Sequence, residues 1–239
     1  MKKNILIIVL GVITLACIFY GTYRNLFRGR IRWFDDEGNL IMSSEDSNKP
    51  LGKESFSEEL KDFSKIKIDV TIASIGIKEG SSFRIEATYN RENLKPEFEI
   101  KGDTLEIFQN KKRSSVGDNS CRVIVTVPAG TYFDSVRINS NVGDIEFAGI
   151  KGKDLSTDVN VGEITGREID FEDINFNSNV GEINLRLADG NIDDYDIELS
   201  ADVGSVSVAG RSYKKSYNSI GKGGRRIRID TNVGEIKVR

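Results

Sequence analysis

The sequence contains no histidine, only two cysteines and only three prolines among its 239 residues. Histidine is the commonest general base and metal ligand near neutral pH, so its absence removes the usual basis for both kinds of site. Cys17 lies in an apolar segment, and Cys121 is the one cysteine outside it, which excludes a disulfide within the rest of the chain. We expect neither a cofactor nor a metal site.

The charges are nearly balanced, with 34 Lys and Arg residues against 37 Asp and Glu residues and a net charge of −3. A nucleic-acid-binding domain usually carries a basic excess, which this chain lacks, so we expect no nucleic acid partner. Charged residues near balance make up 30% of the chain, which argues against gross disorder. The 23 glycines favour tight corners over rigid linkers.

One tripeptide, Asn-Val-Gly, recurs through the second half of the chain. The copies start 19, 19, 23 and 30 residues apart, counting one variant with Asp in place of Asn. A repeat at this spacing is typical of coils that bury their apolar faces only against their neighbours. The residues that define these corners are Asn141, Gly143, Asn160, Gly162, Asn179, Gly181, Asp202, Gly204, Asn232 and Gly234.

The flanks of each copy alternate between apolar and polar residues. Val136 and Ile138 precede the first copy, Ile145 and Phe147 follow it, and Glu146 is expected to face water. Glycine at the third position suits a backbone with positive φ, and Asn tolerates turn geometry. The pattern therefore predicts strand, corner and strand, stacked into a β-solenoid.

Two sets of polar side chains would stack at these corners. The asparagines are expected to form a structural ladder of side-chain amides rather than a ligand site. The acids that follow the glycines would lie about 4.8 Å apart or a small multiple of that distance, where like charges repel. Calcium could relieve this repulsion, but the glycine-rich pattern of calcium-loaded repeats is absent, so we favour solvated side chains. These acids are Asp144, Glu163, Glu182 and Glu235.

The amino-terminal region predicts a membrane anchor. Residues 1–3 form a short cytoplasmic end, and residues 4–23 are twenty uncharged residues, enough to span a bilayer as a helix. A cleaved signal peptide and lipid attachment at Cys17 are the alternatives. Residues 24–63 are interpreted as a juxtamembrane stalk with one short helix over 55–63. Four arginines at 24, 28, 30 and 32 oppose Lys2 and Lys3 in the positive-inside count, which leaves the orientation open.

The remaining residues, 64–239, show β periodicity throughout. Ile66, Ile68, Val70 and Ile72 alternate strictly, and Ile75-Gly76-Ile77 is interpreted as a decayed first corner. No stretch after Phe63 has a helical period. The sequence thus predicts an all-β domain, preceded by one transmembrane helix.

Residues 64–239 resemble the bacterial DUF4097 family of putative-adhesin domains. The resemblance lies in the opening alternating strand, the segment Val125-Thr126-Val127-Pro128 and the repeated corners. It implies a right-handed β-helix-like solenoid of short repeated coils, often attached to a bacterial membrane and associated with the envelope. The family supplies no catalytic or ligand residues to carry over.

A basic, glycine-rich stretch separates the last two corners. It is interpreted as a projecting loop that contacts an anionic lipid or cell-wall polymer, or as a solvated hairpin without a ligand. Gly221–Gly224 lacks the context of a phosphate-binding loop. The basic residues are Arg211, Lys214, Lys215, Lys222, Arg225, Arg226 and Arg228, with no acid among them.

These observations favour a non-enzymatic, single-pass protein of the bacterial cell membrane. Its β domain would lie outside the cytoplasm and act as a binding or scaffolding module, with an envelope protein as a further partner. One alternative is a polysaccharide-acting enzyme on a β-helix that uses the acids Asp193, Asp194 and Asp196. The other is a membrane scaffold that faces the cytoplasm.

Overall fold

A computed structural model describes residues 54–109, 120–190 and 192–239. The expected membrane segment and residues 24–53 of the expected stalk lie outside these ranges. Within them, no helix is both long and apolar enough to cross a membrane.

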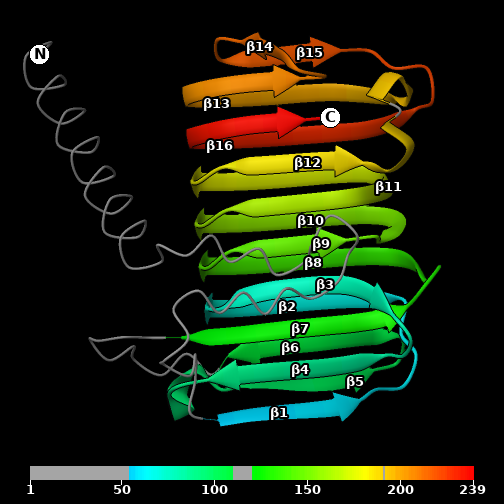
Figure 1. Cartoon of the computed structure of the whole chain (residues 1–239), viewed down its shortest axis with the longest axis vertical. Helices are drawn as coiled ribbons and strands as arrows, with labels where there is room; N and C mark the ends of the chain where they lie inside the picture. Colours follow the sequence, from blue (N-terminus) through cyan, green and yellow to red (C-terminus); the bar gives the residue numbers. More distant parts are fainter. Residues whose placement is uncertain (1–53, 110–119, 191) are drawn as a thin grey trace, which may run out of the picture.

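The described residues form an all-β fold, as the sequence predicts (Figure 1). The strands are β1 (Glu54–Glu59), β2 (Lys65–Ile72), β3 (Ser74–Gly80), β4 (Arg84–Tyr89), β5 (Pro96–Lys101), β6 (Thr104–Gln109), β7 (Cys121–Pro128), β8 (Tyr132–Val142), β9 (Ile145–Ala148), β10 (Lys151–Val161), β11 (Ile164–Val180), β12 (Ile183–Leu187), β13 (Tyr195–Val208), β14 (Arg211–Tyr213), β15 (Ser216–Ser219) and β16 (Arg225–Val238). Three short 3-10 turns, η1 (Glu92–Leu94), η2 (Ala188–Gly190) and η3 (Ile192–Asp194), connect some of them.

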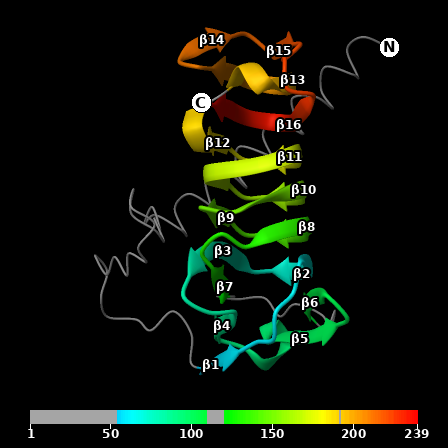
Figure 2. The ribbon, with the colours of Figure 1, turned by 90° about the vertical axis from the view of Figure 1, so that its right-hand side faces the viewer.

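The strands belong to one sheet of 16 strands that is bent into two facing layers. Figure 2 shows β3 and β9 on one side of the stack and β2 and β8 on the other. Layer A runs in the order β5, β6, β2, β8, β10, β11, β16, β13, β15, and layer B runs β1, β4, β7, β3, β9, β11, β12, β16, β13, β14. The long strands β11, β13 and β16 contribute to both layers, because each continues through a corner.

Register keeps the apolar residues of successive coils side by side. Val136 of β8, Leu155 of β10 and Ile174 of β11 are paired neighbours in layer A, and all three are buried. Phe147 and Phe176 stack across the interior with ring centroids 6.0 Å apart. Each coil therefore covers the apolar face of the next, which is the reason for the strict alternation in the sequence.

The corner glycines adopt φ values that other residues rarely reach, from +144° at Gly143 to +158° at Gly234. In the first coil this place is taken by Ala73, whose carbonyl oxygen lies against Gly143. The interpretation of Ile75-Gly76-Ile77 as a decayed corner is wrong, because Gly76 lies within β3, opposite Glu146. The corner comes three residues earlier than the apolar-Gly-apolar pattern indicates.

The coils do not stack in the order of the sequence. β16, which carries Asn232, lies between the coil of Asn179 and the coil of Asp202. Each coil still packs on its neighbours in space, but at the last two copies these are not the neighbours in sequence. The connection between β13 and β16 is long enough to allow this crossover, since it includes β14 and β15.

Antiparallel strands close both ends of the parallel stack. β1 pairs with β4 and β5 pairs with β6 at one end, while β14 and β15 pair with β13 at the other. The helix expected over 55–63 is wrong, because Glu54–Glu59 forms the edge strand β1. Phe56 packs against the core, whereas the acids of β1 are exposed, and charged edge strands of this kind discourage pairing with other chains.

Glu146 does not face water as the alternation suggests. It lies on the outer side of layer B, yet only 7% of its surface is exposed. Its carboxylate forms an ion pair with Arg167 of the next coil. A buried carboxylate requires such a partner, since desolvation alone would strongly disfavour its charge.

Candidate functional site

The corner asparagines form a ladder of side-chain hydrogen bonds along the stack. Asn160 Nδ2 donates to Asn141 Oδ1 at 2.9 Å, and Asn179 Nδ2 donates to Asn160 Oδ1 at 2.6 Å. Asn232 Nδ2 donates to Asn179 Oδ1 at 2.9 Å, which continues the ladder in spatial order and not in sequence order. Each bond joins two coils, so this column has a structural role in holding the register.

The acids beside the corners interact with the protein and with each other. Asp144 Oδ1 accepts a hydrogen bond from the backbone N–H of Glu163 at 2.9 Å. The carboxylate of Glu163 in turn accepts bonds from Thr165 and Asn184 at 3.1 and 3.2 Å. Loss of solvation, with the charges of Asp144 and Glu182 adding to it, raises the pKa of Glu163. Within the described ranges, no group of three or more His, Cys, Asp or Glu residues is arranged to hold a metal ion.

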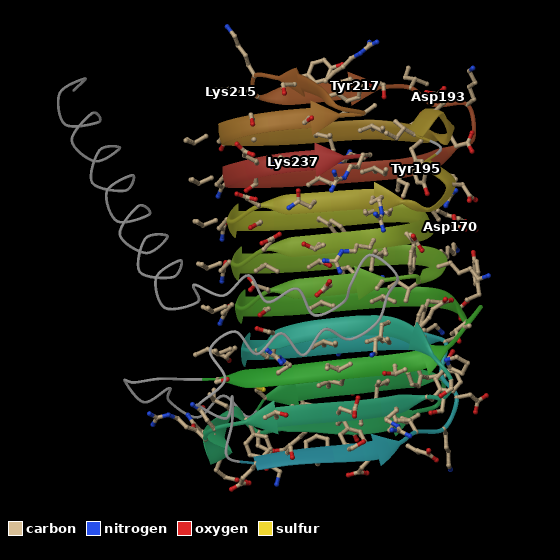
Figure 3. All side chains as sticks on the ribbon, in the orientation of Figure 1. Asp170, Asp193, Tyr195, Lys215, Tyr217 and Lys237 are labelled. Atoms are coloured by element: carbon tan, nitrogen blue, oxygen red, sulfur yellow. The ribbon has the colours of Figure 1, made fainter. Side chains whose placement is uncertain are left out.

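Four exposed basic residues lie along the end of the stack that β14 and β15 close. Arg211, Lys214, Lys215 and Lys222 are all exposed, and we call these four residues the basic end. None of them forms an ion pair with another described residue. Figure 3 shows Lys215 at the top of the stack, beside Tyr217. The sequence contains no acid from residue 203 to residue 229, so the basic end has no acid of its own segment to offset it.

The other three basic residues of this stretch do not belong to a projecting loop. Arg225, Arg226 and Arg228 lie in β16 and pair with acids of neighbouring coils. Arg226 reaches Asp173 at 3.6 Å, and Arg228 Nε and Nη2 bind one oxygen of Glu198 at 3.0 and 2.7 Å. The prediction of seven uncompensated charges is therefore wrong for these three, because their partners come from coils that are distant in sequence.

Arg225 is the most enclosed of the three. Its guanidinium forms an ion pair with Asp170, donates to the carbonyl oxygen of Phe171 at 2.9 Å and lies 4.4 Å from the ring centroid of Tyr195. The Tyr195 hydroxyl donates to the same carbonyl at 3.0 Å, and burial raises the pKa of Tyr195 to about 12. Figure 3 shows Asp170 and Tyr195 together along one edge of the stack. This cluster fixes the start of β16.

The glycines at 221 and 223 allow this segment to pack closely against the backbone of residues 194 and 195. A β-carbon on Gly221 would lie 2.4 Å from the backbone of Tyr195, and one on Gly223 would lie 2.8 Å from the carbonyl oxygen of Asp194. Gly221 N–H donates to Asp196 Oδ1 at 2.8 Å. Lys222 N–H donates to the Asp193 carbonyl oxygen at 2.9 Å. The acid cluster proposed for an enzyme thus includes one carboxylate that holds this loop in place.

The two tyrosines of the stretch close the end of the core. Tyr213 and Tyr217 are partly buried against it, with ring centroids 4.7 Å apart. Both rings therefore leave only part of their surface available to a ligand. Ile220, which the sequence pattern did not single out, is 89% exposed directly before the glycine run. The sequence feature that could have indicated Ile220 is its isolation as an aliphatic residue in a stretch of Ser, Asn, Gly and Lys.

The sequence model of the Toastrack DUF4097 family matches residues 63–239. The chain belongs to the Toastrack family. Among solved structures, the Toastrack domain is similar to a putative cell adhesion protein from Clostridium sporogenes ATCC 15579, with 16% identity and a TM-score of 0.54 over 77% of this chain and 98% of that chain. This likeness shows a shared fold.

A second similar structure is a putative adhesin from Bacteroides fragilis NCTC 9343. It has 15% identity and a TM-score of 0.39 over 77% of this chain and 96% of that chain. No curated protein matches the sequence.

Proposed function

We propose that this protein is a non-enzymatic, single-pass membrane protein of the bacterial envelope whose Toastrack domain binds an anionic polymer through the basic end. The observation that carries the proposal is the presence, at one end of the stack, of four exposed cations that pair with no described acid. Uncompensated charge of one sign attracts polyanions and raises their local concentration. The similar protein from Clostridium sporogenes is named a putative cell adhesion protein, which is consistent with a binding module.

The basic end lies far from the strand that follows the expected anchor. Nine spacings of about 4.8 Å separate β1 from β14 in layer B, which is about 43 Å. The exposed Ile220 adds an aliphatic contact beside Lys222. A phosphate-bearing wall polymer fits this chemistry, since it offers repeated anions that several lysines can contact at once.

Binding is tested with the full-length chain in a nonionic detergent and a purified phosphodiester-linked wall polymer. Changing Arg211, Lys214 and Lys215 to Ser should weaken cosedimentation at least tenfold in low salt. The matched control changes Lys61, Lys151 and Lys153 to Ser, which removes the same charge elsewhere and should leave binding nearly intact. Wild-type binding should also fall as salt rises, because the Debye length shortens from about 10 Å at 0.1 M to about 3 Å at 1 M.

Two results would contradict this assignment. One is equal loss of binding in the two triple variants, which would indicate attraction by net charge alone. The other is the absence of wild-type binding in low salt. Anionic vesicles serve as a second probe, since binding to vesicles in preference to the polymer would reassign the ligand to lipid headgroups.

The orientation of the domain needs a separate experiment. Asn218 is exposed in β15, so an Asn218→Cys variant offers an accessible thiol. We expect a membrane-impermeant maleimide to label this thiol in intact cells. Labelling only after lysis would place the domain in the cytoplasm.

A further inference from the structure

Both ends of the stack are edges of the sheet. Among the described strands, β1 pairs only with β4 and β5 only with β6 at one end, while β14 and β15 pair only with β13 at the other (Figure 1). Each end therefore has one edge strand from layer A and one from layer B. Backbone N–H and C=O groups along such an edge can pair with a strand of another chain.

An aromatic pair closes the core at each end. Phe56 of β1 stacks on Phe98 of β5 with ring centroids 5.8 Å apart, and Tyr213 of β14 and Tyr217 of β15 form the corresponding pair at the other end. All four rings are only partly buried against the core. Each end thus has an aromatic surface that remains partly exposed, and such surfaces contribute strongly to contacts between proteins.

The two aromatic pairs occupy equivalent positions in the sheet register. Following the paired residues from strand to strand through layer B leads from Tyr213 at one end to Phe56 at the other. The same path through layer A leads from Tyr217 to Phe98. A second copy that continued both layers in register would therefore place an aromatic pair directly on an aromatic pair.

This register also brings opposite charges together in layer B. β14 runs antiparallel to β13 and β1 runs in the direction of β13, so β14 of one copy and β1 of the next would be antiparallel neighbours. With their aromatic residues opposite each other, Arg211 comes opposite Glu58, and Lys215 comes opposite Glu54. All four charged residues are exposed. Glu54 accepts a hydrogen bond from the neutral Tyr89 hydroxyl at 2.8 Å, which leaves its charge uncompensated.

The charges allow opposite ends to meet and keep like ends apart. β1 carries three glutamates, and β5 carries two glutamates and one lysine, so we call the end that they form the acidic end. Two acidic ends repel each other, as do two basic ends, whereas an acidic end and a basic end attract. A contact between two different surfaces of this kind does not close on itself, so further copies can be added.

We propose that copies of this protein stack end to end, with the basic end of one Toastrack domain on the acidic end of the next, so that both layers continue from copy to copy. This association differs from the polymer binding proposed above, because the partner is a second copy of the chain. β14 and β15 contain only three and four residues, so the contact is small and the assembly depends on protein concentration. Polymer and a second copy would compete for the basic end.

Charge reversal at each end tests this association in the full-length chain, in nonionic detergent at low salt. The sedimenting mass of the wild type should rise with protein concentration. Two variants should remain single copies over the same range, one with Glu54→Lys and Glu58→Lys, the other with Arg211→Glu and Lys215→Glu. An equimolar mixture of the two variants should associate again, because the two altered ends are then opposite in charge to the ends that they meet. Melting curves establish that both variants are folded.

The matched control carries Lys151→Glu and Lys153→Glu, which reverse two charges away from both ends. It should associate as the wild type does. A wild type that stays a single copy, or a mixture that associates no more than its components, would overturn the proposal. These measurements contain no wall polymer, so they leave the polymer-binding proposal untouched.

A disulfide between two copies tests the register. Continuing layer B places Ser212 of one copy opposite Ser57 of the next, and both residues are exposed. With Cys17 changed to Ser, a mixture of the Ser57→Cys and Ser212→Cys proteins should form a mixed disulfide dimer under mild oxidation. Asn218→Cys is the control, because Asn218 lies at the same end but in layer A. It should cross-link to Ser57→Cys at least tenfold less, and equal yields would contradict the continuation of the layers.

Discussion

Gly162 lies so close to the preceding coil that a β-carbon at this position would stand 2.0 Å from the carbonyl oxygen of Gly143. The same contact recurs between Gly181 and Gly162 at 1.8 Å and between Gly234 and Gly181 at 1.8 Å. Glycine is therefore required at these corners for two reasons, the positive φ and the lack of space.

The first prediction separates these two reasons. Gly162→Ala should lower the free energy of unfolding by about 3 kcal/mol or more, because it combines backbone strain with a clash against backbone. Gly102 has a φ of +62°, and no atom lies within 4 Å of the place that a β-carbon would take, so Gly102→Ala should cost only about 1 kcal/mol. Urea denaturation measures both. Equal losses would mean that close stacking of the corners adds nothing.

The second prediction concerns the asparagine ladder. Asn160 participates in two amide bonds, one to Asn141 and one from Asn179, whereas Asn232 has one, to Asn179. Replacing Asn160 by Ala should therefore cost about 1–2 kcal/mol, and Asn232→Ala about half of that, at a net value near 1 kcal/mol per bond. Chemical denaturation of the two variants checks the ranking. A larger loss for Asn232 would show that the bonds do not act separately.

A third prediction follows from the raised pKa of Glu163. The folded protein holds this proton more tightly than the unfolded chain does, so the ionised carboxylate destabilises the fold above its folded pKa. That penalty disappears as the pH falls through the folded pKa. Glu163→Gln should hence raise the melting temperature at pH 7 and have little effect near pH 4.

The control for this experiment is Glu58→Gln, because Glu58 is an exposed residue of the edge strand β1. It should change the melting temperature little at either pH. Stabilisation by Glu163→Gln of the same size at both pH values would contradict the electrostatic explanation.

The fourth prediction distinguishes two adjacent arginines. The side chain of Arg225 is 27% exposed and binds Asp170, the Phe171 carbonyl and the Tyr195 ring, so Arg225→Ala should cost about 2–3 kcal/mol. The side chain of Arg226 is 59% exposed and has one ion pair, so Arg226→Ala should cost less than about 1 kcal/mol. Thermal melting of both variants decides whether Arg225 anchors β16.

The fifth prediction concerns Cys121. Burial raises the pKa of its thiol to about 12, so almost no thiolate is present at pH 8. Iodoacetamide should leave Cys121 unmodified in the folded protein and alkylate it in urea, as measured by peptide mass spectrometry. Rapid alkylation without denaturant would mean that β7 opens readily. The same property makes Cys121 unsuitable as a topology probe in cells.

Local features of the fold could be predicted from the sequence, because they arise from contacts that repeat in every coil. The alternation around Val136 and Ile145 and the corner at Gly143 each reflect a requirement that a single repeat already contains. The order of the coils could not be predicted in this way. Asn232 and Asp202 lie in nearly identical motifs, so the sequence does not indicate which of them stacks on Asn179.

The candidate site was predictable only in part. Lys214 and Lys215 are exposed, as expected for a polar segment between two corners. Arg225 and Arg228 have the same side-chain type, but their acidic partners lie 55 and 30 residues away in sequence. Pairing between residues so far apart depends on the crossover of β16, and no local sequence pattern indicates that crossover. The burial of Glu146 could not be predicted either, because its partner Arg167 belongs to the next coil.

The position of β16 also determines how the domain can be completed during synthesis. β13 leaves the ribosome first, yet among the described strands it pairs only with β14, β15 and β16. Until the 14 residues of β16 are available, β13 and its two partners have no place on the growing stack. A chain terminated just before Arg225 would thus lose the attachment of two coils, not one, and would expose an unpaired parallel edge on β11 and β12. Proteases and chaperones that recognise open edges could then discriminate sharply between truncated and complete chains.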